Sequence, residues 1–207
     1  MPSTRSALML PLSSPAFEKA RNMKLFAPAA ALTLLACSSA APAAGTLAAD
    51  RPEMAQAQMM LVSSPAFSPG GPIALGYSAY GKNDMPPLSW SALPAGTQSL
   101  ALIVEDPDAS TPQPFVHWTA WNISPTAHGV PDGLAGAVQG ANGAGKPGWR
   151  GPHPSDAKLH HYHFQLFALD RKLALPATAG RDELLAAMKG HVIGKGRLVG
   201  TFTKPKG

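Results

Sequence analysis

Proline and glycine interrupt this chain so often that long regular segments have little room. The 207 residues include 22 Pro and 20 Gly, whereas charged residues make up only 14%. Proline breaks a helix and glycine weakens one, so frequent turns favour short strands. The length allows one substantial core but hardly two. The sequence therefore predicts a single all-β domain with one or two short helices.

Four segments have the length and pattern of strands. The first, from Ser99 to Val104, is continuously apolar and ends at the turn formers Asp106 and Asp108, which is typical of a strand buried on both faces. In the second, the alternation of the pleat puts His117 on the face opposite Trp118. The four segments are 99–104, 116–123, 162–169 and 198–202.

One segment indicates a helix, and one loop is unusually long. From Asp182 to about Lys189, acidic residues occupy the first turn, apolar residues follow at helical spacing, and Gly190 comes next as a stop. The stretch 136–154 is rich in Gly and Pro. Loops of this length are uncommon in a compact domain and tend to carry function.

The N-terminal part of the chain has the zones of an export signal. Met23 and Lys24 precede an apolar stretch from Leu25 to Ala36 that is too short to span a bilayer. We therefore expect Met23 to be the true start, residues 1–36 to be lost on export, and the mature protein to be periplasmic. Whether the residues before Met23 are translated stays open.

The only cysteine of the chain, Cys37, follows Leu34-Leu35-Ala36 and resembles the lipidated cysteine of a bacterial lipobox. Ordinary cleavage near the A-x-A site at 41–43 is the alternative. A single cysteine excludes an intramolecular disulfide, so the fold must depend on packing. Residues 37–58 are rich in Ala and lack an apolar period, so we expect a linker there and the folded domain at 59–207.

The net charge of +5 does not indicate a nucleic-acid partner. Residues 1–36 contribute +3 of it, and the rest of the chain carries 13 basic and 11 acidic side chains. No stripe of Lys and Arg is present that could follow a polyanion. We expect no nucleic-acid partner, and contact with a membrane only through a lipid anchor at Cys37.

A series of short motifs follows in one order along residues 60–203. They are Asn83 to Trp90, Ser99 to Val104 with Asp106-Pro107-Asp108, His117-Trp118 with Asn122-Ile123, Gly151 to Pro154, His160 to Phe164, Ala168 to Asp170, and Met188 to His191. Together they resemble the phosphatidylethanolamine-binding protein family, in its bacterial Raf-kinase-inhibitor-like branch. The sequence departs from the family pattern at Met85, Trp149 and Ser155, which affects the rim of the family's pocket.

The resemblance implies a Greek-key antiparallel β-sandwich with a small anion pocket near one end of a sheet. It implies a phosphate-containing small molecule or a phospholipid head group as ligand, no catalytic residue, no cofactor and no metal. A homodimer and an unidentified protein partner stay open. Carried over motif by motif, the family's pocket residues fall on Asp106, Asp108, His117, Gly151, Pro152, His160 and Tyr162.

These residue types suit a phosphate group. Carboxylates at Asp106 and Asp108 would raise the pKa of the two pocket histidines, so that charged imidazoles meet a phosphate at neutral pH. A carboxylate could also accept the ammonium of an ethanolamine head group. Gly151 has no Cβ and would let its N–H approach an oxyanion closely, and Pro152 would stiffen that loop.

Other functions have weaker signals. The string from Gly140 to Lys146 nearly spells a P-loop, but Pro147 stands where the magnesium-binding Ser or Thr belongs. The string closest to a hydrolase nucleophile motif, Gly76 to Tyr80, fails at its last position. A His/Asp pocket could still perform acid–base chemistry on a small phosphorylated or ester substrate. An enzyme therefore remains an alternative, as does an inhibitor of a kinase or protease.

Overall fold

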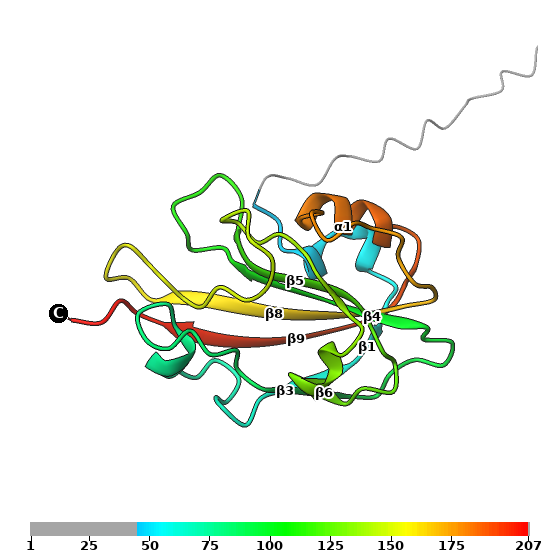
Figure 1. The fold of residues 1–207 in the computed structure, drawn as a ribbon, viewed down its shortest axis with the longest axis horizontal. Coiled ribbons are helices and arrows are strands. Elements are labelled where there is room, and N and C mark those ends of the chain that lie inside the picture. Colours follow the sequence, from blue (N-terminus) through cyan, green and yellow to red (C-terminus); the bar gives the residue numbers. More distant parts are fainter. Residues whose placement is uncertain (1–44, 207) are drawn as a thin grey trace, which may run out of the picture. The chain divides into compact units, whose positions relative to one another are not determined.

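The computed structural model describes residues 45–206. In this part of the chain strands dominate, together with one α-helix and four short 3-10 helices (Figure 1). The expected export signal at 1–36, the start at Met23 and the lipidation of Cys37 lie outside the described residues. The 3-10 helices are η1 (Ala48–Asp50), η2 (Pro52–Met54), η3 (Leu75–Tyr77) and η4 (Asp132–Leu134).

Six strands form the larger sheet, in the order β1, β9, β8, β4, β5, β7. Its centre is antiparallel, because β8 pairs with both β4 and β9 and β4 pairs with β5, whereas β1 runs parallel to β9. The strands are β1 (Gln58–Met59), β4 (Ser99–Asp106), β5 (Phe115–Ile123), β7 (Val138–Gln139), β8 (His160–Leu169) and β9 (Val192–Phe202). The four strands expected from the sequence lie in β4, β5, β8 and β9, and the all-β class is confirmed.

A smaller sheet packs on one face of the larger one. Leu88 and Trp90 of the smaller sheet share a core with Leu102 and Val104 of β4. Among residues 45–206, most of the buried large aromatic side chains lie in this core, so the two sheets form a face-to-face pair. The strands of the smaller sheet, in the order β2, β3, β6, are β2 (Leu61–Ser63), β3 (Leu88–Ser91) and β6 (Gly129–Val130).

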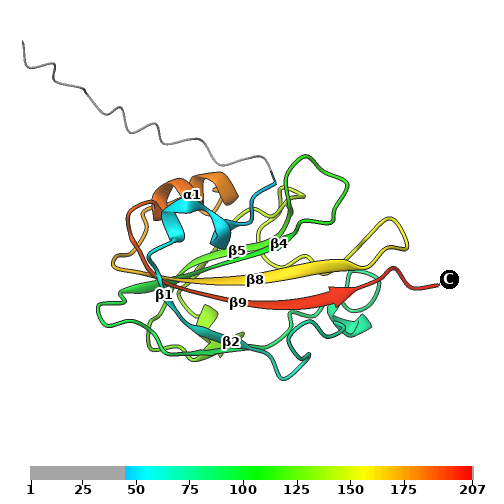
Figure 2. The same cartoon turned by 180° about the vertical axis from the view of Figure 1, so that it is seen from behind.

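The opposite face of the larger sheet is covered by α1 (Arg181–Met188) and by η1 and η2 (Figure 2). Ala101 and Ile103 of β4 belong to the core on this face, together with Leu184 of α1. Successive residues of β4 thus enter the two cores in turn. This explains the continuous apolar run at 99–104, which predicts a strand buried on both faces.

Helix α1 begins one residue before its predicted start and ends at Met188. The carboxylate of Glu183 accepts a hydrogen bond from the backbone N–H of Gly180 at 3.1 Å, which satisfies one of the free donors at the helix N-terminus. Leu185 and Met188 are buried beside Leu184 on the sheet side of the helix. Within residues 45–206, no helix is long and apolar enough to cross a membrane.

Residues 45–58, the described part of the expected linker, pack against the larger sheet. Ala48 and Ala49 are buried, and their backbone N–H groups donate to Glu105 at 2.9 Å and to Gln165 at 2.7 Å. Asp50 forms an ion pair with Arg197 at 2.8 Å. The folded unit therefore begins before residue 59. Small side chains in this segment let its backbone N–H groups reach the polar side chains of Glu105 and Gln165 on the sheet. We call residues 45–58 the N-terminal strap.

A buried ion pair fixes the N-terminal strap and α1 to the sheet. The carboxylate of Glu105 is fully buried and pairs with the guanidinium of Arg181, whose side chain is 9% exposed. Arg181 also donates to the carbonyl of Thr46 at 2.7 Å, and Gln165 donates to Glu105 at 2.5 Å. One carboxylate thus joins the strap, strands β4 and β8, and helix α1.

Candidate functional site

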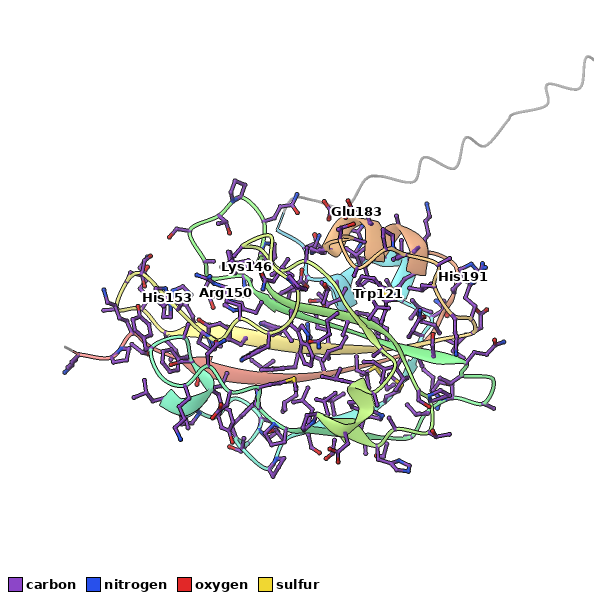
Figure 3. All side chains as sticks on the ribbon, in the orientation of Figure 1. Trp121, Lys146, Arg150, His153, Glu183 and His191 are labelled. Atoms are coloured by element: carbon purple, nitrogen blue, oxygen red, sulfur yellow. The ribbon has the colours of Figure 1, made fainter. Side chains whose placement is uncertain are left out.

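A cavity of about 220 Å³ lies at the end of the larger sheet where β4 ends and β5 and β8 begin. Two of its lining residues, Arg150 and His153, are labelled in Figure 3 at the end of the sheet opposite His191. Long-range pairing of strands brings the lining together from segments that are distant in the sequence. The lining comes from Asp106, 109–111, Phe115, His117, Arg150, 153–155 and His160.

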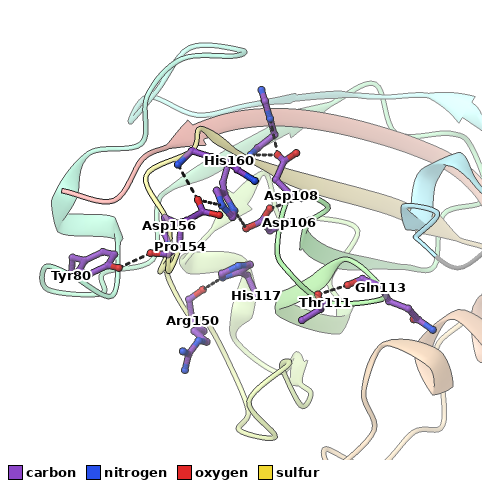
Figure 4. A network of polar contacts seen from close by, with 12 residues as sticks. Tyr80, Asp106, Asp108, Thr111, Gln113, His117, Arg150, Pro154, Asp156 and His160 are labelled. Carbon is purple, nitrogen blue, oxygen red and sulfur yellow. Dashed lines mark hydrogen bonds and ion pairs between the residues drawn. The ribbon is translucent and has the colours of Figure 1, made fainter. Parts of the chain in front are cut away.

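Asp106 and His160 form a buried pair in this cavity (Figure 4). The Oδ2 atom of Asp106 lies 2.7 Å from Nδ1 of His160, and both side chains are 4% exposed. Burial raises the pKa of Asp106, and its contact with His160 only partly opposes this. Burial alone would lower the pKa of His160, but the hydrogen bonds and charges of Asp106 and Asp156 outweigh it and raise that pKa. His160 therefore keeps its proton to a higher pH than an ordinary histidine.

His117 is held in the opposite protonation state. Its Nδ1 lies 2.6 Å from the carbonyl oxygen of Arg150, and because a carbonyl only accepts, Nδ1 carries the hydrogen. Burial lowers the pKa of His117 to about 4. The prediction that nearby carboxylates raise the pKa of both histidines is thus wrong for His117, because the ring is buried against the carbonyl instead of a carboxylate.

A β-bulge explains where the His117 side chain lies. Val104 pairs with Trp118 and Glu105 with Val116, so His117 is an extra residue on β5. A bulge re-aims the side chain of the residue that it leaves unpaired. The ring of His117 packs edge-on against Tyr162 at 5.0 Å between centroids. Strict alternation, which the sequence pattern assumed, does not hold at this position.

Arg150 supplies a cation at the cavity. Its guanidinium carbon lies 5.7 Å from the centre of the Phe115 ring, a distance at which a cation and an aromatic face attract each other. Among residues 45–206, Arg150 takes part in no ion pair, whereas Arg51, Arg181 and Arg197 each pair with a carboxylate. Its charge is therefore not neutralised by an ion pair, although its guanidinium points away from His160 and only its carbonyl faces His117 (Figure 4).

The hydroxyl of Tyr162 is a buried donor without a good partner. Burial, then the charge of Asp106, raises the pKa of Tyr162, which places the hydroxyl near that carboxylate. No group in the described part of the chain meets it in hydrogen-bonding geometry. A buried polar group of this kind is costly unless something satisfies it.

A model of the phosphatidylethanolamine-binding protein family matches residues 63–203. The chain belongs to this family. A UPF0098 protein of Chlamydia pneumoniae is 43% identical over 150 residues, which cover 70% of this chain and 99% of that protein. LppC of Mycobacterium tuberculosis, whose name describes it as a candidate lipoprotein, is 40% identical over 164 residues, covering 78% of this chain and 80% of LppC.

Two solved structures described as relatives of phosphatidylethanolamine-binding protein share the fold. The homologue CT736 from Chlamydia trachomatis has a TM-score of 0.66 and 40% identity, covering 72% of this chain and all of that one. YbcL of E. coli, described as a new member of the mammalian family, has a TM-score of 0.66 and 30% identity, covering 70% of this chain and 99% of YbcL. The fold expected from the family resemblance is thereby supported.

The structure brings together some of the pocket residues carried over from the phosphatidylethanolamine-binding family and separates others. Asp106, His117 and His160 line the cavity, and Tyr162 packs against His117. Asp108 does not line the cavity. Its carboxylate accepts hydrogen bonds from the backbone N–H and the ring Nδ1 of His161, both at 2.8 Å.

Gly151 and Pro152 also lie outside the cavity lining. The N–H of Gly151 donates to the side-chain oxygen of Asn83 at 2.7 Å, and the carbonyl of Pro152 accepts from Ala79 at 3.0 Å. Here the Gly151 N–H that was expected to face an anion has a protein partner. Both residues position the loop that carries Arg150 and His153 into the cavity wall.

Sequence reasoning missed Arg150, His153 and Phe115. The ring of His153 stacks on Tyr80 at 4.4 Å, and the Tyr80 hydroxyl donates to the carbonyl of Pro154 at 2.6 Å. The length of the Gly/Pro-rich loop was a signal that it carries function, but nothing in its composition selected Arg150. Within residues 45–206, no cluster of three His, Cys, Asp or Glu side chains is placed to hold a metal ion.

Proposed function

We propose that this member of the phosphatidylethanolamine-binding protein family is a binding protein whose cavity takes the phosphate group of a small molecule or of a phospholipid head group. The observation that carries the proposal is the proton-holding imidazole of His160 on the wall of a small cavity whose lining also includes Arg150, a residue without an ion pair among residues 45–206. Charge-assisted hydrogen bonds from Arg and His⁺ to phosphate are among the stronger polar contacts in proteins.

The size of the cavity favours a small anionic group. Pockets for drug-sized ligands usually measure about 300–1,000 Å³, and this cavity of about 220 Å³ is smaller. A phosphate or an ethanolamine phosphate fits such a volume, whereas acyl chains of a phospholipid would have to remain outside. The head group is therefore the part of a lipid that the cavity would recognise.

The remaining charges of the cavity agree with an anionic ligand. Asp106 is the carboxylate that lines the cavity, and its charge is directed at His160. The hydroxyl of Tyr162, which is fully buried and outside the cavity lining, lies close to this pair and adds no charge. His117 is neutral at physiological pH because of its burial, so it adds no charge.

We further propose that the protein is exported and anchored through Cys37. Support comes from the signal-like sequence before Cys37 and from the name of the mycobacterial relative LppC. Mass spectrometry of the N-terminus of the mature protein tests this. A diacylglyceryl group on Cys37 supports the anchor, a free terminus near Ala43 supports a periplasmic form, and an intact Met1 contradicts export.

Substitution of either cation should weaken binding of a phosphate ligand. A hydrogen bond to a charged group contributes about 1.5–3 kcal/mol, so Arg150→Gln and His160→Gln should each lower the affinity for O-phosphoethanolamine by roughly tenfold or more. Isothermal titration calorimetry in phosphate-free buffer measures this. Lys172→Gln, which removes the same charge at an exposed position, is the matched control and should bind like the unmodified protein.

Three ligands separate the chemical sources of the phosphate. O-phosphoethanolamine, inorganic phosphate and glycerophosphoethanolamine share the anionic group, and only the last is a phosphodiester like a phospholipid head group. A preference for the diester favours a lipid, and a preference for O-phosphoethanolamine or inorganic phosphate favours a small metabolite. Unchanged affinity in both cation variants would place the site elsewhere. Turnover of a ligand, followed by ³¹P NMR in the same samples and lost in His160→Gln, would instead favour an enzyme.

The affinity for glycerophosphoethanolamine should fall as the pH rises. A phosphodiester keeps one negative charge across neutral pH, so the pH dependence reports the protein. The pKa of His160 is raised above its usual 6.5, so binding should be strongest at pH 6 and weaken as the pH passes the raised pKa. Calorimetry at several pH values measures this, and His160→Gln should flatten the profile. Binding that strengthens with pH would contradict a charged His160.

A further inference from the structure

Both ring nitrogens of His160 already face a carboxylate. Nδ1 lies 2.7 Å from Asp106, whose side chain is 4% exposed, and Nε2 lies 3.3 Å from Oδ1 of Asp156, whose side chain is 35% exposed (Figure 4). Charge-assisted contacts between nitrogen and carboxylate oxygen are usually about 2.7–2.9 Å long. The contact with Asp106 is of this strong kind and is buried, whereas the contact with Asp156 is long and open to solvent.

The position of Asp156 is set by its own loop. Its Oδ1 atom also accepts a hydrogen bond from the backbone N–H of Lys158 at 2.9 Å, so the carboxylate closes a local turn. The loop is held at its start by the hydrogen bond from Tyr80 to Pro154 and by Lys204, whose ammonium lies 3.3 Å from the carbonyl of Ser155. In residues 45–206, no Lys or Arg forms an ion pair with Asp156.

These contacts leave a ligand only one nitrogen of His160. An anion cannot reach Nδ1 without breaking the buried contact with Asp106. It can reach Nε2, but there it meets the negative charge of Asp156 at hydrogen-bonding distance of the same donor. Two anions cannot share one N–H without repelling each other. The carboxylate of Asp156 and an anionic ligand therefore compete for the same proton.

We propose that Asp156 is an internal competitor of the anionic ligand, a carboxylate that contacts Nε2 of His160 and must be displaced on binding. The inference rests on the proposed function of the cavity and adds a determinant of specificity to it. Anions that make a single weak contact do not displace Asp156. A phosphate, which has more charge and more acceptor oxygens, attracts the imidazolium more strongly and does. Asp156 thus lowers the affinity of the cavity for all anions and leaves measurable binding only to those that interact strongly, such as phosphate.

The variant Asp156→Asn tests this competition. Asparagine keeps the side-chain oxygen that accepts from Lys158, so the local turn is retained while the negative charge is removed. The affinity for inorganic phosphate, measured by NMR titration of the full mature protein at pH 6, below the ordinary histidine pKa of 6.5 so that His160 keeps its proton in both proteins, should rise about three- to tenfold. Inorganic phosphate is the probe because it has no ammonium that could pair with Asp156. The matched control is Asp170→Asn, which removes a carboxylate 2.9 Å from His191.

Two further measurements make the outcome decisive. In the double variant His160→Gln/Asp156→Asn the gain should disappear, since the contested donor is absent. The pKa of His160, followed by its ring resonances without ligand, should fall in Asp156→Asn because one of the carboxylates that raise it is gone. A gain in phosphate affinity that Asp170→Asn reproduces, or that survives His160→Gln, would overturn the competition.

The result also separates this inference from the proposed function. If the unmodified protein binds phosphate and Asp156→Asn binds it equally or more weakly, Asp156 is no competitor and the cavity keeps its proposed function. If Asp156→Asn alone binds phosphate, the competition is supported in its strongest form. If no variant binds any phosphate compound, both the function and the competition are refuted.

Discussion

Replacing Arg181 by methionine is expected to lower the free energy of unfolding by about 3–5 kcal/mol, the usual cost of leaving one partner of a buried ion pair alone. The carboxylate of Glu105 is fully buried, and Arg181 is its partner in the ion pair. Methionine has a similar length and keeps the packing, so the loss would report the charge. The hydrogen bonds from Gln165 and Ala48 remain, but neither group carries a compensating charge.

Urea denaturation of the mature protein, followed by tryptophan fluorescence, measures this loss. The double variant Glu105→Gln/Arg181→Met should recover most of it, because a neutral amide keeps the hydrogen bonds and leaves no buried charge. Arg171→Met, at an exposed position, is the control and should change stability by no more than about 0.5 kcal/mol. An equal loss in Arg181→Met and in the control would mean that Glu105 is neutral or compensated in another way.

The sequence predicts the centre of the larger sheet well because local pattern and burial coincide there. The run from Leu100 to Val104 is apolar throughout, and each of its side chains enters one of two cores. Strand β9 was predicted only from residue 198, although it begins at Val192. Its first half contains Gly194 and Gly196, where a Cβ would lie 2.7 Å from Pro94 or from the carbonyl of Met60. These glycines are needed because residues distant in the sequence pack closely against the strand. A local sequence pattern does not contain that information, so the start of the strand was missed.

The N-terminal strap shows a second limit of local patterns. Its sequence has no apolar period, and small Ala residues are typical of linkers as well as of close packing. Ala48 and Ala49 are buried because their backbone N–H groups meet the side chains of Glu105 and Gln165 on the sheet. A Glu directly after the apolar run of a strand buried on both faces was itself a signal that a partner must exist, but it does not say which segment supplies it.

The candidate site could be predicted in its residue types and only partly in its geometry. Motif order selected Asp106 and His160, and the structure pairs them. The order of the motifs could not predict the bulge that re-aims His117, because the extra residue is defined by the pairing of β5 with β4. Asp108 was grouped with Asp106 because both flank one proline, yet its carboxylate is bonded to His161. Although Asp106 and Asp108 are only two residues apart, their carboxylates therefore have different partners, His160 and His161.

Gly151→Ala is expected to destabilise the protein by about 1–3 kcal/mol, the usual cost of forcing an extra carbon into a packed site. A Cβ at this position would lie 2.3 Å from the carbonyl oxygen of Tyr77 and 2.9 Å from the carbonyl carbon of Ser78. Both are backbone atoms, so the loop as a whole would have to move. The N–H of Gly151 would then lose its 2.7 Å hydrogen bond to Asn83, and Arg150 would shift with it.

Urea denaturation of Gly151→Ala and of Gly76→Ala separates this packing role from the role that the family resemblance implies. Gly76 has open space where a Cβ would be, so alanine there should leave stability unchanged or raise it by about 0.4–1 kcal/mol through the unfolded chain. A Gly151→Ala protein of normal stability that no longer binds O-phosphoethanolamine would contradict the packing role, because it would mean that the backbone of Gly151 contacts the anion. Loss of stability together with weaker binding is the expected result, since the same loop carries Arg150 into the cavity wall.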